Sequence, residues 1–322
     1  MTNTVTYVVD PPVQMVIDAI AGANVEPAPT LAEERKRAND TMLLLARPVP
    51  DSITVTDHSV PVAGGAITLR TYRPASAPAT APVYLFIHGG GWFQGNIETS
   101  EIECWPLAEA TSAVVASVDY RLAPEHKFPT AIDDCVAAYT WLHTHATELG
   151  IDPSRVAVGG GSAGGNLSAA LCLIARDTGL PMPCLQLLDI PCIDATCSTP
   201  SIDELADGYG LTKAAIETYL ERYLNDPSER TDPRMSPRLA PDLSGLPPAV
   251  VFTAELDPLR DDGEAYVKQL RQAGVAAAAL RVTGHVHGSW IIPITISSAL
   301  VHDLHVSALR RAFDGTLTTL FA

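Results

Sequence analysis

The sequence predicts an α/β fold in which a mostly parallel central sheet is covered on both faces by helices. Short, solidly apolar runs such as 83–87 are typical of strands that are buried on both faces. From residue 113 onward such runs alternate with longer amphipathic segments, and this alternation favours parallel strands joined by crossover helices. A chain of 322 residues with 47% hydrophobic residues can bury one large core.

The expected elements follow one another in a regular order. Strands are predicted at 53–62, 66–72, 83–87, 113–119, 155–158, 184–190, 249–254 and 277–282. Helices are predicted at 11–23, from Thr30 onward, and at 130–149, 166–175, 212–224, 261–273 and 295–313. Thr30 precedes Glu33 by three residues, which is the spacing of a capping box. The Gly64-Gly65 pair between the first two strands predicts a hairpin.

Two segments interrupt the alternation and define the expected organisation of the chain. The N-terminal segment 1–48 reads as helices only, and 191–225 combines an irregular stretch with one helix. In open α/β sheets, ligands bind at the carboxyl ends of the strands, so both segments are candidates for a cap there. The prediction is therefore 1–48 as N-terminal cap helices, 49–190 and 226–322 as the two parts of one core, and 191–225 as a cap insertion.

Charge and cysteine usage exclude several classes of partner. The net charge of −16 argues against nucleic acid and against anionic membranes. The residues that follow Met1 contain no basic region with an apolar run behind it, and no apolar segment reaches membrane-spanning length. The six cysteines are scattered, with Cys192 and Cys197 close enough in sequence to pair. We therefore expect a reduced, cytoplasmic protein that binds neither nucleic acid nor membrane.

The stretch 156–166 carries the first chemical signal. Gly160 to Gly164 fits G-x-S-x-G, in which a sharp strand-to-helix turn exposes the hydroxyl of the central serine, here Ser162. The motif alone should occur by chance in roughly one protein in ten of this length. An apolar strand before it and a helix after it provide the context that the motif requires.

A serine nucleophile needs a base and a carboxylate that orients the base. Asp257 follows the strand 249–254, but it could also cap the turn at Pro258, and Glu255 is a rival acid that we expect in a structural salt bridge. His285 and His287 compete for the base, and periodicity does not choose between them.

A second histidine pair lies near the end of the chain. His302 and His305 share a helix face and could bind a metal, but no third ligand is evident, so we read both as surface or packing residues. The sequence therefore indicates no metal and no cofactor.

The run His88-Gly89-Gly90-Gly91 is rarer than the serine motif, with a chance occurrence below roughly one protein in a hundred. Glycines there leave backbone N–H groups free to converge on an oxyanion, together with the N–H of Ala163 after the nucleophile. His88 itself is expected to be structural.

Five motifs in this order resemble the hormone-sensitive-lipase-like branch of the α/β-hydrolase carboxylesterases, over nearly the whole chain from about residue 50. They are H-G-G-G at 88–91, D-Y-R-L-A-P-E-H at 119–126, G-G-S-A-G-G-N at 160–166, D-P-L-R-D at 257–261 and H-G at 287–288. The resemblance implies an α/β-hydrolase fold with a helical cap. It also implies Asp257 and His287 as the partners of Ser162, and an oxyanion hole of Gly89, Gly90, Gly91 and Ala163.

Three positions depart from the pattern of that family. Gly161 stands where the family usually has Asp or Thr, which predicts a looser turn. Ser289 replaces the usual aromatic residue, and His285 replaces an apolar one. Both are candidates to alter the pocket wall or the base.

The hypothesis from sequence is a serine carboxylesterase with a small-molecule ester as its partner. By resemblance, its substrates are small to medium uncharged esters with short acyl chains, and it can pair as a homodimer. Trp92, Tyr209 and Leu211 are candidate pocket-wall residues. An amidase, arylformamidase or acyltransferase on the same triad and a non-catalytic small-molecule receptor are the alternatives.

Overall fold

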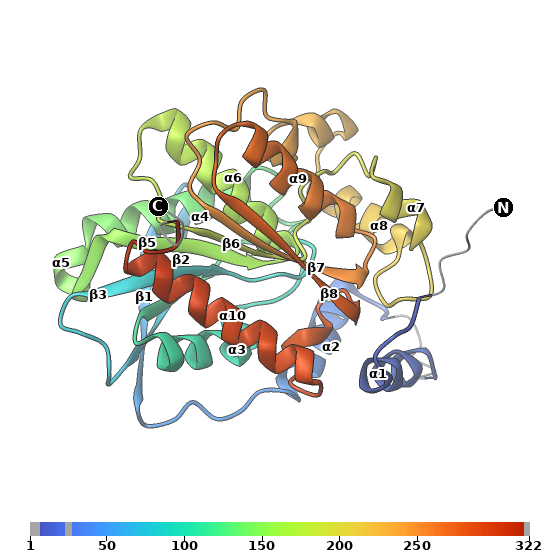
Figure 1. Cartoon of the computed structure of the whole chain (residues 1–322), viewed down its shortest axis with the longest axis horizontal. Helices are drawn as coiled ribbons and strands as arrows, with labels where there is room; N and C mark the ends of the chain where they lie inside the picture. Colours follow the sequence, from blue (N-terminus) through green and yellow to red (C-terminus); the bar gives the residue numbers. More distant parts are fainter. Residues whose placement is uncertain (1–6, 23–27, 319–322) are drawn as a thin grey trace.

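An eight-stranded sheet organises the molecule, in the order β1-β2-β4-β3-β5-β6-β7-β8 (Figure 1). The structure is a computed structural model that describes residues 7–22 and 28–318. β2 pairs antiparallel with β1 and with β4, and every other neighbouring pair is parallel. The mostly parallel sheet and the hairpin predicted from the sequence are both present.

The elements have the following bounds. The strands are β1 (Ile53–Val62), β2 (Gly65–Pro74), β3 (Ala81–Ile87), β4 (Val114–Asp119), β5 (Ile151–Gly161), β6 (Gln186–Asp189), β7 (Ala249–Leu256) and β8 (Ala277–Val286). The α-helices are α1 (Pro11–Gly22), α2 (Leu31–Leu43), α3 (Ile97–Thr111), α4 (Thr130–Thr144), α5 (Ala146–Leu149), α6 (Ala163–Thr178), α7 (Pro200–Glu204), α8 (Lys213–Tyr223), α9 (Arg260–Gln272) and α10 (Ile296–Phe313). Short 3-10 helices are η1 (Pro227–Thr231), η2 (Pro237–Leu239) and η3 (Ser289–Ile291).

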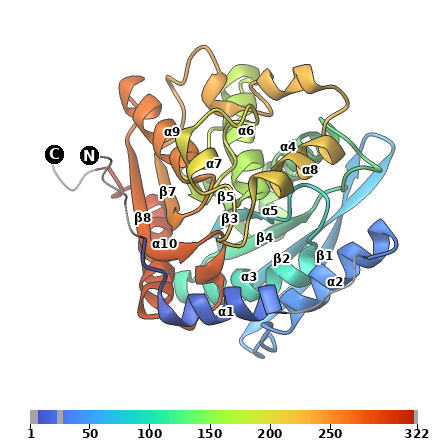
Figure 2. The same ribbon diagram turned by 90° about the vertical axis from the view of Figure 1, so that its right-hand side faces the viewer.

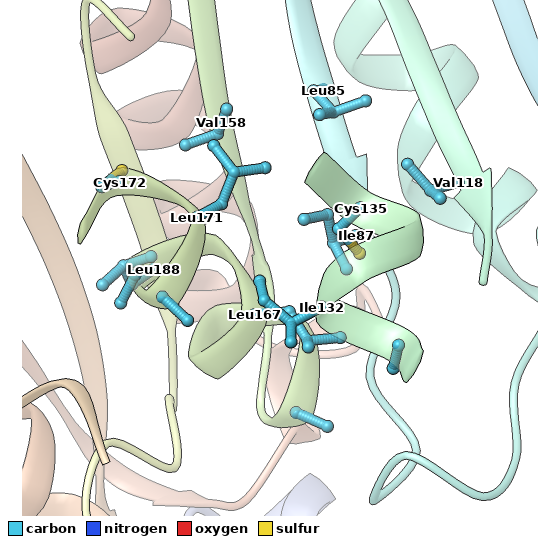
Figure 3. Close-up of a cluster of buried hydrophobic side chains, with 14 of the residues drawn as sticks. Leu85, Ile87, Val118, Ile132, Cys135, Val158, Leu167, Leu171, Cys172 and Leu188 are labelled. Atoms are coloured by element: carbon cyan, nitrogen blue, oxygen red, sulfur yellow. The ribbon is translucent and has the colours of Figure 1, made fainter. Parts of the chain in front are cut away.

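Helices cover both faces of the sheet and divide the core into two main clusters. α4, α6 and α9 pack on one face, and α3 and α10 pack on the other (Figure 1). Figure 3 shows part of the first cluster, where strand residues meet residues of α4 and α6. The labelled members are Leu85, Ile87, Val118, Ile132, Cys135, Val158, Leu167, Leu171, Cys172 and Leu188. Burial of such side chains on both faces accounts for the solidly apolar strands.

The helix α3 is the main element that the sequence analysis missed. Its start is encoded locally, because the Asn96 side chain accepts a hydrogen bond from the N–H of Thr99 and the Thr99 hydroxyl accepts one from the N–H of Asn96. Pro106 lies inside this helix. Because proline is rare in helix interiors, it argued against predicting a helix there. The predicted single helix 130–149 is also wrong, because His145 leaves the helical conformation and separates α4 from α5.

Four helices lie together on the side of the molecule that faces the viewer in Figure 2, namely α1, α2, α7 and α8. Arg222 on α8 forms a two-pronged ion pair with Glu34 on α2, at 2.8 and 2.9 Å. The segments 1–48 and 191–225, which interrupt the alternation of strands and helices, are therefore in contact through an ion pair. Residues 1–6, on which the expectation of no signal peptide rests, and Ala23, the predicted end of the first helix, lie outside the described residues.

Two further expectations concern membranes and thiols. Within the described ranges, the helices all fall short of the length and apolarity that a bilayer span requires. All six cysteines are free thiols, Cys192 and Cys197 included.

Candidate active site

The turn at Ser162 joins β5 to α6, and its glycines are required by crowding. Ser162 itself has φ 55° and ψ −115°, a strained conformation that lifts its side chain off the sheet. A Cβ atom at Gly160 would lie 1.9 Å from the carbonyl oxygen of Ile87, and one at Gly164 would lie 1.8 Å from the same oxygen. Strand and helix thus both pass β3 too closely for any side chain at either position.

The third glycine of the turn, Gly161, behaves differently. Its φ lies outside the left-handed region, and an added Cβ would meet nothing closer than 4.0 Å, at Asp189. A side chain is therefore sterically allowed where the family pattern has one. We expect Gly161→Ala to raise the free energy of unfolding by about 0.4–1 kcal/mol, because it restricts the unfolded chain.

The matched variant is Gly164→Ala, which we expect to lower the free energy of unfolding by about 3 kcal/mol or more, since the helix must move away from β3. Urea unfolding of both variants beside the wild type measures the two effects. Equal destabilisation by the two alanines would contradict the crowding argument.

Three side chains from distant parts of the sequence form one hydrogen-bonded line. The Nε2 atom of His287 lies 3.0 Å from the hydroxyl oxygen of Ser162, and its Nδ1 atom lies 2.7 Å from Oδ2 of Asp257. Asp257 is fully buried, and its Oδ1 accepts a hydrogen bond from the N–H of Leu259 at 2.9 Å. A carboxylate can only accept, so Nδ1 donates to it and Nε2 is left to accept from the serine hydroxyl.

The rival acid and base have other partners. The Oε2 atom of Glu255 accepts a hydrogen bond from the N–H of Gly284 at 2.8 Å, so in the described part of the chain it forms no salt bridge, contrary to the expectation. His285 is fully buried, with Nδ1 2.8 Å from the Ser289 hydroxyl and Nε2 2.7 Å from the Ser297 hydroxyl. Burial lowers the pKa of His285. The departures at 285 and 289 therefore bind one another and do not line the cavity beside Ser162.

The glycine loop after β3 lies directly against Ser162. A Cβ at Gly89 would lie 2.9 Å from the carbonyl oxygen of Gly161 and 3.5 Å from Cβ of Ser162. Gly90 and Gly91 have φ of 112° and 58°, which glycine adopts without strain. Among the described residues, no protein acceptor takes the N–H groups of Gly90, Gly91 or Ala163. These donors remain available to a ligand.

His88 holds the base of this loop. Its Nδ1 atom donates to the carbonyl oxygen of Gly89 at 2.8 Å, its own carbonyl oxygen accepts from the Tyr120 hydroxyl at 3.0 Å, and the two rings stack at 4.1 Å. Burial lowers the pKa of His88 to about 4, so the ring is neutral. The loop is also tied to α2, because the side chain of Asn39 accepts a hydrogen bond from the N–H of Gly95.

A cavity of about 250 Å³ opens over Ser162 and His287, between the glycine loop and helices α2, α3 and α8. Two of the predicted wall residues, Trp92 and Leu211, line it, and Trp92 also stacks on Tyr223 at 4.8 Å. Tyr209 is not among the lining residues. It packs instead against a small cluster that contains Val13. Tyr209 and Leu211 both precede α8 but pack against different clusters, so proximity in sequence to Leu211 was misleading.

Sequence analysis missed the cavity residues that come from α2 and α3. They are Ala38, Asn39, Met42, Thr99, Ser100 and Glu103. The only signal that could have located those on α3 was the capping pair Asn96 and Thr99, which was not recognised. Glu103 stands out among them as the one ionisable side chain.

Glu103 belongs to a group of ionisable side chains between β6, α3 and α10. His305 is buried and its Nε2 atom lies 2.9 Å from Oδ1 of Asp189, an interaction that raises the pKa of His305 against the opposing effect of burial. Burial, and then the charge of Asp189, raises the pKa of Glu103 to about 7. Of the two expected roles, surface or packing, His305 therefore has the second, as a buried side chain hydrogen-bonded to Asp189. The described residues contain no cluster that could hold a metal ion.

The raised pKa of Glu103 predicts a pH-dependent contribution to stability. The folded state holds this proton up to about pH 7, whereas the unfolded chain releases it near the ordinary value, so wild-type stability falls as pH rises through that window. Glu103→Gln removes this loss. The free energy of unfolding of the variant relative to wild type should therefore rise by up to about 3 kcal/mol between about pH 5 and about pH 8.

The measurement is urea unfolding at several pH values. Glu109→Gln is the control, because Glu109 lies exposed on the same helix and away from the cavity. A pH-independent difference between Glu103→Gln and wild type would show that Glu103 does not titrate in this window.

Comparison with known proteins adds independent information. A family model described as alpha/beta hydrolase fold matches residues 84–291. The carboxylic ester hydrolase LipN of Mycobacterium tuberculosis (strain ATCC 25618 / H37Rv) is 45% identical over 259 residues, covering 78% of this chain and 69% of that protein. The ethyl acetate hydrolase of Pseudomonas putida is 38% identical over 259 residues, covering 79% and 81%. The crystal structure of a thermophilic and thermostable carboxylesterase cloned from a metagenomic library has a TM-score of 0.84 at 39% identity, covering 90% of this chain and 99% of that one.

Proposed function

Because the chain belongs to the alpha/beta hydrolase family, in its hormone-sensitive-lipase-like carboxylesterase branch, we propose that Ser162, His287 and Asp257 are the catalytic triad of this enzyme. The protein is a carboxylic ester hydrolase. The observation that carries the assignment of the triad is the hydrogen-bonded line from Asp257 through His287 to the hydroxyl of Ser162.

The chemistry follows from that line. The Ser162 oxygen attacks the ester carbonyl while Nε2 of His287 accepts the hydroxyl proton, and the same nitrogen then donates it to the departing alcohol. Asp257 keeps the proton on Nδ1 and stabilises the imidazolium that forms. Water, deprotonated by His287, attacks the acyl-enzyme, and collapse of the second tetrahedral intermediate releases the acid and restores the serine.

The oxyanion of each tetrahedral intermediate needs donors, and we assign the N–H groups of Gly90, Gly91 and Ala163 to this role, with Gly89 shaping the loop. Their lack of a protein acceptor within the described chain supports the assignment. In a site closed to bulk water, each such donor contributes about 3–4 kcal/mol of transition-state stabilisation.

Substrates are small to medium uncharged esters with short acyl chains. A cavity of about 250 Å³ limits the acyl and alcohol groups together, and Trp92 and Leu211 form part of its wall. The name of one relative, ethyl acetate hydrolase, points in the same direction. The division of the chain is part of this proposal: 1–48 and 191–225 form the cap, and 49–190 and 226–322 form the core.

A panel of p-nitrophenyl esters of increasing acyl length, with p-nitroanilides of the same acids beside them, tests this function. We expect kcat/KM to be highest for short esters, to fall as the acyl chain outgrows the cavity, and to be far lower for the anilides. Faster cleavage of the anilides would favour the amidase alternative instead.

Location and assembly complete the proposal. Six free thiols are typical of a reducing compartment, which supports a cytoplasmic protein. β8 lies at the edge of the sheet, and α10 exposes Ile296, Leu300 and Leu304, features that suit a homodimer. Cell fractionation and light scattering of the purified protein test the two statements, and a periplasmic or a strictly monomeric protein would refute them.

A further inference from the structure

The carboxyl group of Glu103 lacks a protein partner although it lies in the catalytic cavity. Within residues 7–22 and 28–318 it takes part in no hydrogen bond and no ion pair. The other two carboxylates near the nucleophile are both paired, Asp257 with His287 and Asp189 with His305. The oxygen atoms of Glu103 are not among the buried polar atoms that lack a partner, so they remain open to solvent and to a ligand in the cavity.

Glu103 stands at the partition between two cavities. A second cavity of about 320 Å³ lies on the other side of it, lined also by residues of η3 and α10, and the two cavities share Glu103 and Ile291. The side chain is half-buried, and the surface that remains exposed therefore faces these cavities. Ser162 and Glu103 line the same cavity, and within the described chain a ligand that contacts the carboxyl there displaces no protein hydrogen bond.

The charges around Glu103 leave an excess of negative charge when it is ionised. The groups that face it are Asp189 on β6, His305 on α10, Tyr84 on β3 and its own neighbour Cys104. Burial raises the pKa of the tyrosine and of the cysteine well above the ordinary values, so both are neutral. The hydrogen bond from His305 is made to Asp189, so Glu103 has no hydrogen-bonded partner of opposite charge among these groups.

Three further titratable groups line the second cavity, and none of them pairs with Glu103 in the described structure. They are Arg47, His302 and Asp303. Arg47 stacks over the ring of Trp105 at 4.9 Å instead. Phe86 lines the catalytic cavity beside Glu103, and aromatic rings attract ammonium groups.

We propose that Glu103 is a specificity-determining residue that binds the ammonium group of ester substrates carrying one, and so favours cationic esters over neutral esters of the same shape. The proposal rests on the esterase function above and revises its substrate class, because it adds cationic esters of similar size to the uncharged esters proposed there. A cation within contact distance of a carboxylate in a cavity of reduced dielectric is strongly attracted, which supplies the missing counter-charge. With its pKa at about 7, the same carboxyl is protonated in acidic solution and then admits neutral esters equally well.

The test compares acetylcholine with 3,3-dimethylbutyl acetate, which has the same shape without the charge. We expect wild type to show a higher kcat/KM for acetylcholine, and Glu103→Gln to lower the ratio of the two constants by about tenfold or more. Glu109→Gln, which removes the same charge from an exposed site of the same helix, should leave the ratio unchanged. In wild type the ratio should rise between about pH 6 and about pH 8, because Glu103 becomes ionised while acetylcholine keeps its charge. Titration of His287 affects both substrates equally and therefore does not change the ratio.

Each outcome decides the question. A wild type that prefers the neutral ester, a ratio that Glu103→Gln leaves intact, or a pH-dependence that persists in that variant would overturn the proposal. If Glu103→Gln does not fold, the pH-dependence of the wild-type ratio decides, and a flat profile refutes it. Failure of the esterase function looks different, because the wild type would then hydrolyse neither acetate.

Discussion

Replacing Ser162 with alanine is expected to lower kcat for ester hydrolysis by about six orders of magnitude, as loss of a serine nucleophile does in other triads. The fold should survive, because Ser162 bonds to its neighbours through backbone atoms, with its N–H donating to Asp189 and its carbonyl oxygen accepting from Asn166. Steady-state hydrolysis of p-nitrophenyl acetate, with the circular dichroism spectrum of the same sample, measures both statements.

Ser168→Ala is the matched control for that variant. Ser168 is buried on α6, the helix that follows Ser162, and its hydroxyl donates to the carbonyl oxygen of Gly164. We expect the control to lose about 1 kcal/mol of stability and to keep its activity within about tenfold. If Ser162→Ala retained hydrolysis, or if both variants lost it equally, Ser162 would not be the nucleophile.

Asp257→Asn is expected to lower kcat by about four orders of magnitude. The amide can donate a proton to Nδ1 of His287, which leaves the proton of the neutral ring on Nε2. That nitrogen can then no longer accept from the hydroxyl of Ser162, although it lies within 3.0 Å of it. Stopped-time assays at high enzyme concentration reach this range of rates.

Glu255→Gln tests whether Glu255, and not Asp257, is the acid that orients His287. Its side chain accepts a hydrogen bond from the N–H of Gly284, and glutamine retains an oxygen that can do so. We expect this variant to keep nearly full activity. Severe loss in Glu255→Gln together with an active Asp257→Asn would reverse the assignment of the acid.

The strand-to-helix turn at Ser162, the proposed nucleophile, could be predicted from sequence alone because the constraint there is local and steric. Gly160 and Gly164 both face the carbonyl oxygen of Ile87, so the spacing of the glycines records the geometry of the turn directly. The fold class was predictable for a similar reason, since strands buried on both faces must be apolar throughout.

Sequence periodicity could not decide whether His285 or His287 is the base. An extended stretch would point both side chains the same way, but the pairing of β7 with β8 shifts between Ala254 and Leu256, and Gly284 adopts φ 73°. The two histidines consequently diverge, one into a cluster of hydroxyl groups and the other towards Ser162. A local irregularity of this kind leaves no periodic signal.

The cavity wall was the least predictable part, because it depends on how distant helices meet. Glu103 could not be assigned to the cavity wall without α3, and that helix was not predicted because it contains Pro106. Tyr209 shows the opposite error, since only Gly210 separates it from Leu211 in the sequence but the two side chains pack against different clusters.

The central claim is that the hydroxyl of Ser162 forms the covalent intermediate. Reaction with a p-nitrophenyl alkylphosphonate, followed by mass spectrometry of the digested protein, tests it most directly, because phosphonates mimic the tetrahedral intermediate and stay bound. We predict one adduct per chain, on the peptide that contains Ser162, and none in Ser162→Ala. An adduct on another residue, or no adduct in an enzyme that still hydrolyses esters, would contradict the account.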